Sequence, residues 1–330
     1  MTVPALSVII PCRLGAGLGV EMRGALLRLT LVALDCQTTP KDDFEVVLVD
    51  DASDIALDSF VDSFSHEHPS LRLRVLRNTG PVHGQSHAYN LGLDATRGRI
   101  VLLCTDDSLL APEAVASHIA AHERHRESAF VCGLERQYVF SVLFRDVIAG
   151  KLQPRGDLAI RAFGSLLGFT DLRRTAEQMG FTDWFVTPDL VRHHYAELQR
   201  RSALTPGFED MYRELESDRT DMNWLAVRMG NHSIHRQALK DIADLDESVG
   251  GGNSDQALGL RLQEAGIPVV LDRGAHSVLL EHRRDLRSFT GDSGLAALAA
   301  RWPRPEVIRL REYFSLGYER SISAYRSLLG

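Results

Sequence analysis

Two neighbouring carboxylates follow an apolar segment in the first third of the sequence. Residues 100–104 are all apolar, and Thr105, Asp106 and Asp107 come directly after them. An apolar run of this length is typical of a strand that is buried on both faces of a sheet. Because burying unpaired ionised groups is costly, we expect both acids in the crevice at the carboxyl end of this strand. Carboxylate oxygens there suit Mg2+ or Mn2+ that holds a diphosphate; a solvated acidic turn is the alternative interpretation.

A second pair of acids, Asp50 and Asp51, follows the largely apolar run 44–49. If both runs are parallel strands, their carboxyl ends meet at one edge of the sheet, together with the loop that contains Pro11 and Arg13. In a nucleotide site, one acid can accept hydrogen bonds from the base or ribose while another holds the metal that neutralises the diphosphate. The alternative interpretation is local, with the two acids in a turn that caps the next helix.

The first third of the chain alternates between strand and helix patterns. This βαβαβ order predicts an α/β fold with a mostly parallel, Rossmann-like sheet flanked by helices and right-handed crossovers. We expect strands over residues 6–10, 44–49, 71–76, 99–104 and 129–132, and helices over 20–34, 55–65, 84–95 and 112–126.

The pattern changes in the middle of the chain. Residues 140–222 have helical periodicity and predict a helical insertion that covers one end of the sheet. Strand character returns afterwards, and the C-terminal tail is again helical. We expect strands at 225–229, 231–235 and 267–271, a helix over 254–265 and helical structure from 286 onward.

The composition is that of an ordinary globular protein. Hydrophobic residues make up 44% and charged residues 25% of the 330 residues, and the net charge is −7. A surface for nucleic acid or for an anionic membrane is therefore not expected. No apolar segment approaches the roughly 20 residues needed for a transmembrane segment. The four cysteines lack Cys-x-x-Cys spacing, so we expect reduced thiols, no structural zinc and a cytoplasmic location.

The order and spacing of several motifs resemble the inverting glycosyltransferase family 2, whose members have the GT-A fold. The resemblance covers roughly residues 5–125 and 225–285. The motifs that carry it are residues 6–11, 37–38, 44–54, 78–80, 88–92, 98, 105–107, 230–236 and 254–262.

The resemblance implies a nucleotide-sugar site at the edge of the sheet. Asp51 would meet the nucleobase, and Pro11 and Arg13 would line the same pocket. Asp50 and Asn90 lie within matched motifs and are assigned to the same site.

The resemblance also implies a metal site that contains Mn2+ or Mg2+. Asp106 would contact the ribose, and Asp107 would bind the cation. Most members have Asp where this chain has Thr105, so the Thr-Asp-Asp sequence is closest to the spore-coat polysaccharide type of the family. A histidine after the last strand completes the metal shell in many relatives. His282 fits the spacing better than His276, and the choice between them stays open.

Asp255 matches the catalytic base in the family's Glu-Asp motif, although Ser254 replaces the glutamate. Inversion at an anomeric carbon is one in-line displacement. A carboxylate takes the proton of the acceptor hydroxyl while the nucleoside diphosphate leaves from the opposite face. Because Asp255 is also expected at the start of a helix, the alternative is a capping role.

The resemblance thus predicts a metal-dependent hexosyltransferase (EC 2.4). It would move a sugar from a UDP- or GDP-linked donor to a hydroxyl of a saccharide, natural product or peptide. The expected parts are a donor-binding half (1–135), a helical insertion on the acceptor side (136–224), an acceptor and catalytic half (225–285) and a helical tail (286–330). Assembly into a homo-oligomer is left open.

Two other functions compete with this prediction. A sugar-1-phosphate nucleotidyltransferase needs a glycine-rich loop with Arg and Lys after the first strand, and residues 13–19 contain no lysine. A non-catalytic nucleotide-sugar binding protein would not need Asp107 and Asp255, and both are present.

Overall fold

The computed structural model describes most of the chain. The described residues are 3–15, 20–55, 57–125, 129–138, 186–217, 219–242, 244–249, 253–282, 291–315 and 321–330. Most of the predicted insertion (139–185) and the glycine run 250–252 lie outside them. None of the helices in the described residues is both long and apolar enough to cross a membrane.

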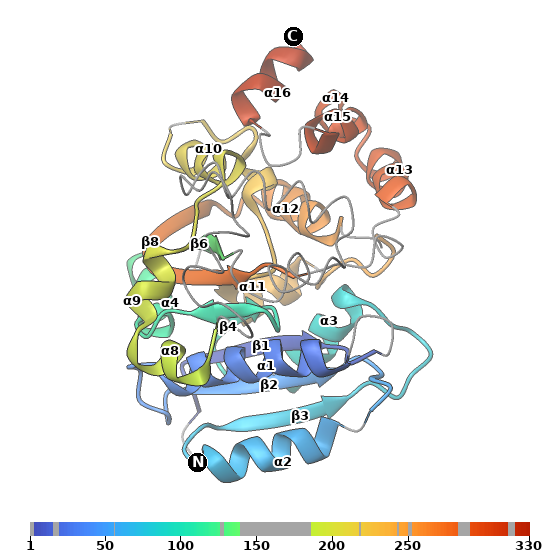
Figure 1. Ribbon diagram of the computed structural model, residues 1–330. Coiled ribbons are helices and arrows are strands. Elements are labelled where there is room, and N and C mark those ends of the chain that lie inside the picture. Colours follow the sequence, from blue (N-terminus) through green and yellow to red (C-terminus); the bar gives the residue numbers. More distant parts are fainter. Residues whose placement is uncertain are drawn as a thin grey trace, which may run out of the picture.

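One mixed sheet runs through the molecule (Figure 1). In the described residues it has eight strands in the order β3-β2-β1-β4-β7-β6-β8-β5. The first four are parallel to one another, as the βαβαβ pattern predicts; β4 pairs antiparallel with β7, and β5 pairs antiparallel with β8. The strands are β1 (Leu6–Cys12), β2 (Phe44–Asp50), β3 (Leu73–Arg77), β4 (Ile100–Cys104), β5 (Ser108–Leu110), β6 (Phe130–Tyr138), β7 (Asn231–His235) and β8 (Val269–Leu280).

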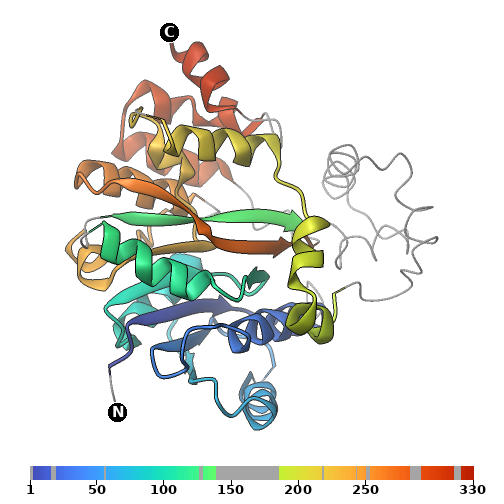
Figure 2. The same ribbon diagram turned by 90° about the vertical axis from the view of Figure 1, so that its left-hand side faces the viewer.

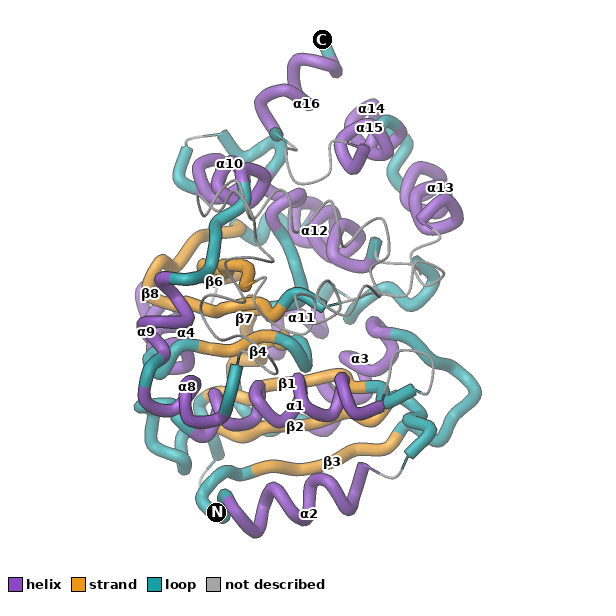
Figure 3. The backbone as a smooth tube through the Cα atoms, viewed as in Figure 1, coloured by secondary structure: helices purple, strands orange, loops and turns teal. Residues whose placement is uncertain are grey.

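Helices cover both faces of the parallel strands (Figure 3). Because successive side chains of a strand point to opposite faces, Val8 and Ile10 pack with α1 and α2, whereas Ile9 packs with α3. A Cβ on Gly92 of α3 would lie 2.4 Å from Ile9 Cγ2, so this helix approaches the sheet as closely as glycine allows. The helices of this half are α1 (Val20–Asp35), α2 (Leu57–Glu67), α3 (Gln85–Ala95) and α4 (Ala114–Arg124).

Most of the remaining helices lie toward the other end of the sheet, and the C-terminal ones lie farthest from α2 (Figures 1 and 2). The remaining helices are α8 (Pro188–His193), α9 (Tyr195–Arg200), α10 (Pro206–Leu215), the 3-10 helix η2 (Asn223–Ala226), α11 (Arg236–Asp241), α12 (Ser254–Glu264), α13 (Gly291–Arg301), α14 (Pro305–Ile308), α15 (Leu310–Ser315) and α16 (Ile322–Leu329). A separate hydrophobic core that contains Trp224, Trp302 and Tyr313 is shared by α10, η2, α12 and the tail helices α13 to α16. In contrast, α8 and α9 pack in the same core as α1 and α2, and α11 packs in the same core as α3.

One predicted strand is wrong. Residues 225–229 do not form a strand, because the chain turns through η2 and enters the sheet only at Asn231. Close packing explains the difference: a Cβ on Gly259 of α12 would lie 2.2 Å from the carbonyl oxygen of Trp224. The last strand is longer than predicted and continues to Leu280.

Candidate active site

Asp106 and Asp107 lie in the turn between β4 and β5, at the carboxyl end of β4. Both are almost fully buried, each with 3% of its surface exposed. Two adjacent buried carboxylates need partners, because they are removed from water and their negative charges repel each other. The structure provides these partners from α1 and from the end of β8.

Arg23 of α1 is the partner of Asp106. Its Nη2 lies 2.6 Å from both carboxylate oxygens of Asp106. Burial raises the pKa of the Asp106 carboxyl, and the Arg23 guanidinium opposes this rise. Arg23 could not be predicted from the sequence, because nothing in its helical surroundings distinguishes it from other surface-spaced arginines.

His282 is the partner of Asp107. Its Nε2 lies 3.0 Å from Asp107 Oδ2, and the imidazole is buried. The backbone brings the two residues together, since the Leu280 N–H donates to the Asp107 carbonyl at 2.8 Å. Of the two histidines considered from the sequence, His282 contacts Asp107, whereas His276 lies farther back in β8, paired with Leu134.

The donor set of Asp107 and His282 fits a divalent cation. Neighbouring ligand atoms of an octahedral ion with bonds of about 2.1 Å are about 3 Å apart, which is the separation of Asp107 Oδ2 and His282 Nε2. The described residues contain no group of three or more His, Cys, Asp and Glu side chains that could hold a metal. An ion here would therefore take its other ligands from substrate oxygens and water, as Mg2+ and Mn2+ commonly do.

Asp50 and Asp51, at the end of β2, have different surroundings. Asp50 Oδ1 accepts a hydrogen bond from the Ser53 N–H at 2.9 Å, which agrees with the turn-capping alternative. Asp51 accepts from the Asn78 side chain and from the Gly84 N–H, both at 2.9 Å. Gly84 has φ of 130°, a conformation that side chains disfavour. Asp51 thus fixes the loop between β3 and α3 against the end of β2.

The other residues assigned to the donor site are more dispersed. Pro11 pairs with Val49 near the ends of β1 and β2, and Arg13 is exposed in the loop that follows. The Asn90 side chain donates to the Leu245 carbonyl at 2.9 Å and to Glu247 at 2.7 Å. The contacts of Asn90 therefore join α3 to the 244–249 loop, and its role in donor binding stays a prediction.

Asp255 lies in the first turn of α12. Its Oδ1 accepts a hydrogen bond from the Met229 N–H at 3.0 Å. Removal of water from this carboxyl raises its pKa to about 6, against the opposing effects of Arg228 and of the Met229 N–H. Arg228 is itself held by Glu135 at 3.2 Å and stacks over the Phe208 ring. A carboxylate with this pKa is ionised at neutral pH and is a stronger base than an ordinary aspartate.

The Tyr89 hydroxyl connects the two acidic regions. Tyr89 is fully buried, and its Oη lies 2.8 Å from the Cys104 carbonyl and 2.9 Å from the Met229 carbonyl. Cys104 is the last residue of β4 before the acidic turn, and Met229 holds Asp255 through its N–H. One side chain of α3 therefore ties the turn of Asp106 and Asp107 to the residue that holds Asp255.

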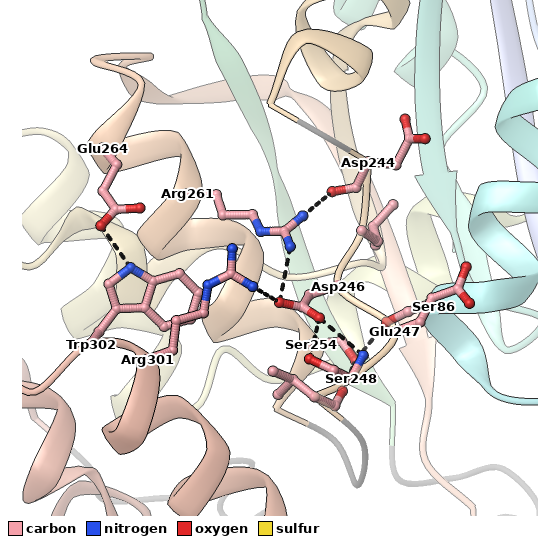
Figure 4. Close-up of polar contacts among 12 residues, drawn as sticks. Ser86, Asp244, Asp246, Glu247, Ser248, Ser254, Arg261, Glu264, Arg301 and Trp302 are labelled. Atoms are coloured by element: carbon pink, nitrogen blue, oxygen red, sulfur yellow. Dashed lines mark hydrogen bonds and ion pairs between the residues drawn. The ribbon is translucent and has the colours of Figure 1, made fainter.

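Further polar contacts hold α12 in place (Figure 4). Ser254 Oγ accepts a hydrogen bond from Ser86 Oγ at 2.9 Å. Farther along α12, Arg261 donates to Asp246 at 2.9 Å, and Arg301 of α13 contacts the same carboxylate. Contacts from α3, the 244–249 loop and the C-terminal tail thus hold the helix that carries Asp255.

Residues 7–170 match the family described as Glycosyl transferase family 2. This match covers just under half of the 330 residues. The match includes Asp51, Asp106 and Asp107, whereas Asp255 and His282 lie beyond it.

Curated proteins with similar sequences bear glycosyltransferase names, which supports a transferase. The chain is 26% identical over 254 residues to "Uncharacterized glycosyltransferase YfnE" of Bacillus subtilis (strain 168), covering 75% of this chain and 59% of the relative. It is 26% identical over 289 residues to "Validoxylamine A glucosyltransferase" of Streptomyces hygroscopicus subsp. jinggangensis (strain 5008), covering 86% of this chain and 57% of the relative. The chain therefore spans less than two thirds of the length of these relatives.

The fold is similar to that of a solved GT-A glycosyltransferase. The match to residues 1–349 of S. aureus TarS, in complex with UDP-GlcNAc, has a TM-score of 0.52 at 14% identity. It covers 98% of this chain and 70% of TarS 1–349. The predicted GT-A fold is confirmed, and the particular resemblance to the spore-coat type stays a prediction.

Proposed function

We propose that this protein is an inverting, divalent-metal-dependent glycosyltransferase. Its donor would be a UDP- or GDP-linked hexose, and its acceptor a hydroxyl of a saccharide, natural product or peptide. The observation that carries the proposal is the link made by Tyr89, which joins the turn of Asp106 and Asp107 to Met229, the residue that holds Asp255. A cation-binding turn and a carboxylate base on one scaffold are what a single in-line displacement needs.

In the proposed reaction, Asp255 takes the proton of the acceptor hydroxyl. The hydroxyl oxygen bonds to the anomeric carbon while the bond from that carbon to the diphosphate oxygen breaks, and the nucleoside diphosphate leaves. The raised pKa of Asp255, about 6, suits this role because the carboxylate is ionised at pH 7 yet retains basicity. Arg228 and the Met229 N–H keep the carboxylate charged in its partly buried place.

Donor binding is assigned to the carboxyl ends of β1, β2 and β4. By family resemblance, Asp51 would bind the nucleobase beside Pro11 and Arg13, and Asp106 would bind the ribose. Asp107 and His282 would hold Mn2+ or Mg2+, which, when bound, neutralises the charge that develops on the leaving diphosphate. The buried setting of both ligands favours this assignment.

The acceptor class remains broad in this proposal. The relative named as a validoxylamine A glucosyltransferase favours a small-molecule acceptor, and the helical residues between β6 and β7 are the proposed acceptor side. A cytoplasmic location is proposed from the four cysteines, all of which are free thiols.

A thermal-shift panel tests donor binding. UDP, GDP and dTDP, with and without Mn2+, should raise the melting temperature only in the combination that fills the site, because a ligand that binds the native state stabilises it by mass action.

Product analysis then separates the alternative functions. A glycosyltransferase releases a nucleoside diphosphate from its donor, whereas a nucleotidyltransferase releases pyrophosphate from a nucleoside triphosphate and a sugar-1-phosphate. Binding without either release would favour the non-catalytic alternative.

A further inference from the structure

Arg23 touches both parts of the acidic site. Its Nη2 binds both oxygens of Asp106 at 2.6 Å, and its Nη1 lies 3.1 Å from His282 Nε2. That same Nε2 lies 3.0 Å from Asp107 Oδ2. The Arg23 side chain is largely buried, with 16% of its surface exposed. A single guanidinium thus stands beside the two residues that we propose as metal ligands.

The hydrogen-bonding chemistry of these groups is specific. A guanidinium in a protein is always protonated and can only donate hydrogen bonds. A carboxylate can only accept, so His282 Nε2 serves one of its two contacts at a time. It donates to Asp107 in the Nε2–H tautomer, and in the Nδ1–H tautomer it accepts from Arg23 with the lone pair that a metal ion would use. In the Nδ1–H tautomer, Arg23 therefore occupies the electron pair that His282 would give to a cation.

The charge of the site leads to the same conclusion. Asp106 and Asp107 together carry −2, and Arg23 reduces the sum to −1. A guanidinium beside a proposed ligand also repels a divalent cation, and this repulsion is strong where water is largely excluded. A nucleoside diphosphate would make cation binding favourable, because it brings negative charge and phosphate oxygens that a guanidinium binds well.

We propose that Arg23 makes divalent-cation binding depend on the nucleoside diphosphate. Without nucleotide, the guanidinium holds Asp106 and His282 and disfavours the cation. With nucleotide, the diphosphate offsets its charge and the cation binds. This inference rests on the proposed function, since it takes the Asp107–His282 pair as the cation site. Arg23 acts here as a positioning residue that sets the coupling between two ligands.

Mn2+ titration of the whole protein tests the inference without any assay of transfer. Free Mn2+ is followed by electron paramagnetic resonance, first with the metal alone and then with saturating UDP or GDP. In Arg23→Met, Mn2+ alone should bind at least about tenfold more tightly than in wild type. The additional gain in Mn2+ affinity that saturating nucleotide produces should be smaller in this variant than in wild type.

Two variants serve as controls. Arg28→Met removes a positive charge from the same helix, where Arg28 pairs with Glu67 away from the acidic turn. Its Mn2+ affinity should match that of wild type. Arg23→Lys keeps the charge and should bind Mn2+ alone within about twofold of wild type. If Arg23→Met does not melt cooperatively, Arg23→Gln takes its place.

The outcomes separate this inference from the proposed function. Equal or weaker Mn2+ binding by Arg23→Met, while Asp107→Asn loses the ion, would overturn the role of Arg23 and leave the proposed metal site intact. A tenfold gain in Arg23→Lys as well would also overturn it, because charge would then not be the cause. Failure of wild type to bind Mn2+ with any nucleoside diphosphate would instead reject the metal site itself.

Discussion

His282 Nε2 and Asp107 Oδ2 lie 3.0 Å apart, although 175 residues separate them in the sequence. The sheet brings them together because β5 begins directly after Asp107 and pairs with the end of β8. Ser108 is paired with Leu279, and the Leu280 N–H donates to the Asp107 carbonyl. A short antiparallel pair at the edge of the sheet therefore fixes the proposed metal ligands.

Asp107→Asn should abolish metal-dependent binding of the donor nucleotide. The amide replaces an anionic ligand with a neutral one and so weakens the attraction for a hard cation. The measurement is the rise in melting temperature that Mn2+ and the nucleoside diphosphate produce together. Asp94→Asn is the matched control, since Asp94 pairs with Lys240 on the surface. An undiminished thermal shift in Asp107→Asn would remove this residue from the metal site.

Asp255→Asn should leave donor binding nearly unchanged and slow transfer by a factor of about 10² or more, the usual effect of losing a positioned base. In wild type, kcat should fall as the pH drops below the Asp255 pKa of about 6, because the protonated carboxyl cannot accept a proton. The residual rate of the variant should lack this acidic limb. Turnover close to wild type would exclude Asp255 as the base, and Asp241→Asn, an exposed acid, provides the control.

Tyr89→Phe tests the link between the acidic turn and Asp255. Loss of the hydroxyl leaves the buried Cys104 and Met229 carbonyls without this partner, and the free energy of unfolding should fall by about 1–3 kcal/mol. Tyr325→Phe is a matched control, because the hydroxyl of this buried side chain also donates to a carbonyl, that of Glu306, in the C-terminal helices away from both acidic regions. Both variants should lose similar stability in chemical denaturation. Only Tyr89→Phe should lower kcat; equal kcat values in both would contradict the link.

Buried histidines should make the protein less stable in mild acid. Burial lowers the pKa values of His118, His122 and His232 below the ordinary 6.5, in His122 to about 3. Between these lowered pKa values and the ordinary value of 6.5, the unfolded chain binds more protons than the native state. The free energy of unfolding therefore rises with pH over this window. His122, with its pKa of about 3, contributes about 2 kcal/mol between pH 5 and pH 7, and His118 and His232 act in the same direction. Asp255, whose pKa is raised, acts in the opposite direction and offsets part of the change.

Urea denaturation at several pH values measures this effect. The increase in the free energy of unfolding with pH should be smaller in His232→Phe, in which the new ring can keep the stacking of His232 on Phe130. A free energy of unfolding that is constant from pH 5 to pH 7 would contradict the prediction for the native histidines.

Sequence patterns predicted the parallel half of the fold well. A largely apolar run marks β2 and a fully apolar run marks β4, and the acids that follow these runs lie at the strand ends. The pattern could not separate Asp50 from Asp51, because a capping acid and a ligand-binding acid have the same side chain in the same turn. Their hydrogen-bond partners are fixed by loops that lie farther along the chain.

Contacts between distant segments account for what the sequence left out. Arg23 pairs with Asp106 from another element, and Arg228 pairs with Glu135 across the sheet. No local periodicity signals such pairs. The missed turn at 223–226 has the same origin, since packing of Trp224 against Gly259 overrides the strand pattern of the sequence.

The most direct test of the account is the position of Mn2+ in a crystal grown with the protein and the nucleoside diphosphate that stabilises it. We expect an anomalous-scattering peak within about 2.1–2.3 Å of both Asp107 Oδ2 and His282 Nε2, with diphosphate oxygens completing the shell. A nucleotide bound with its metal away from these two residues, or bound elsewhere than at the carboxyl ends of β1, β2 and β4, would contradict it.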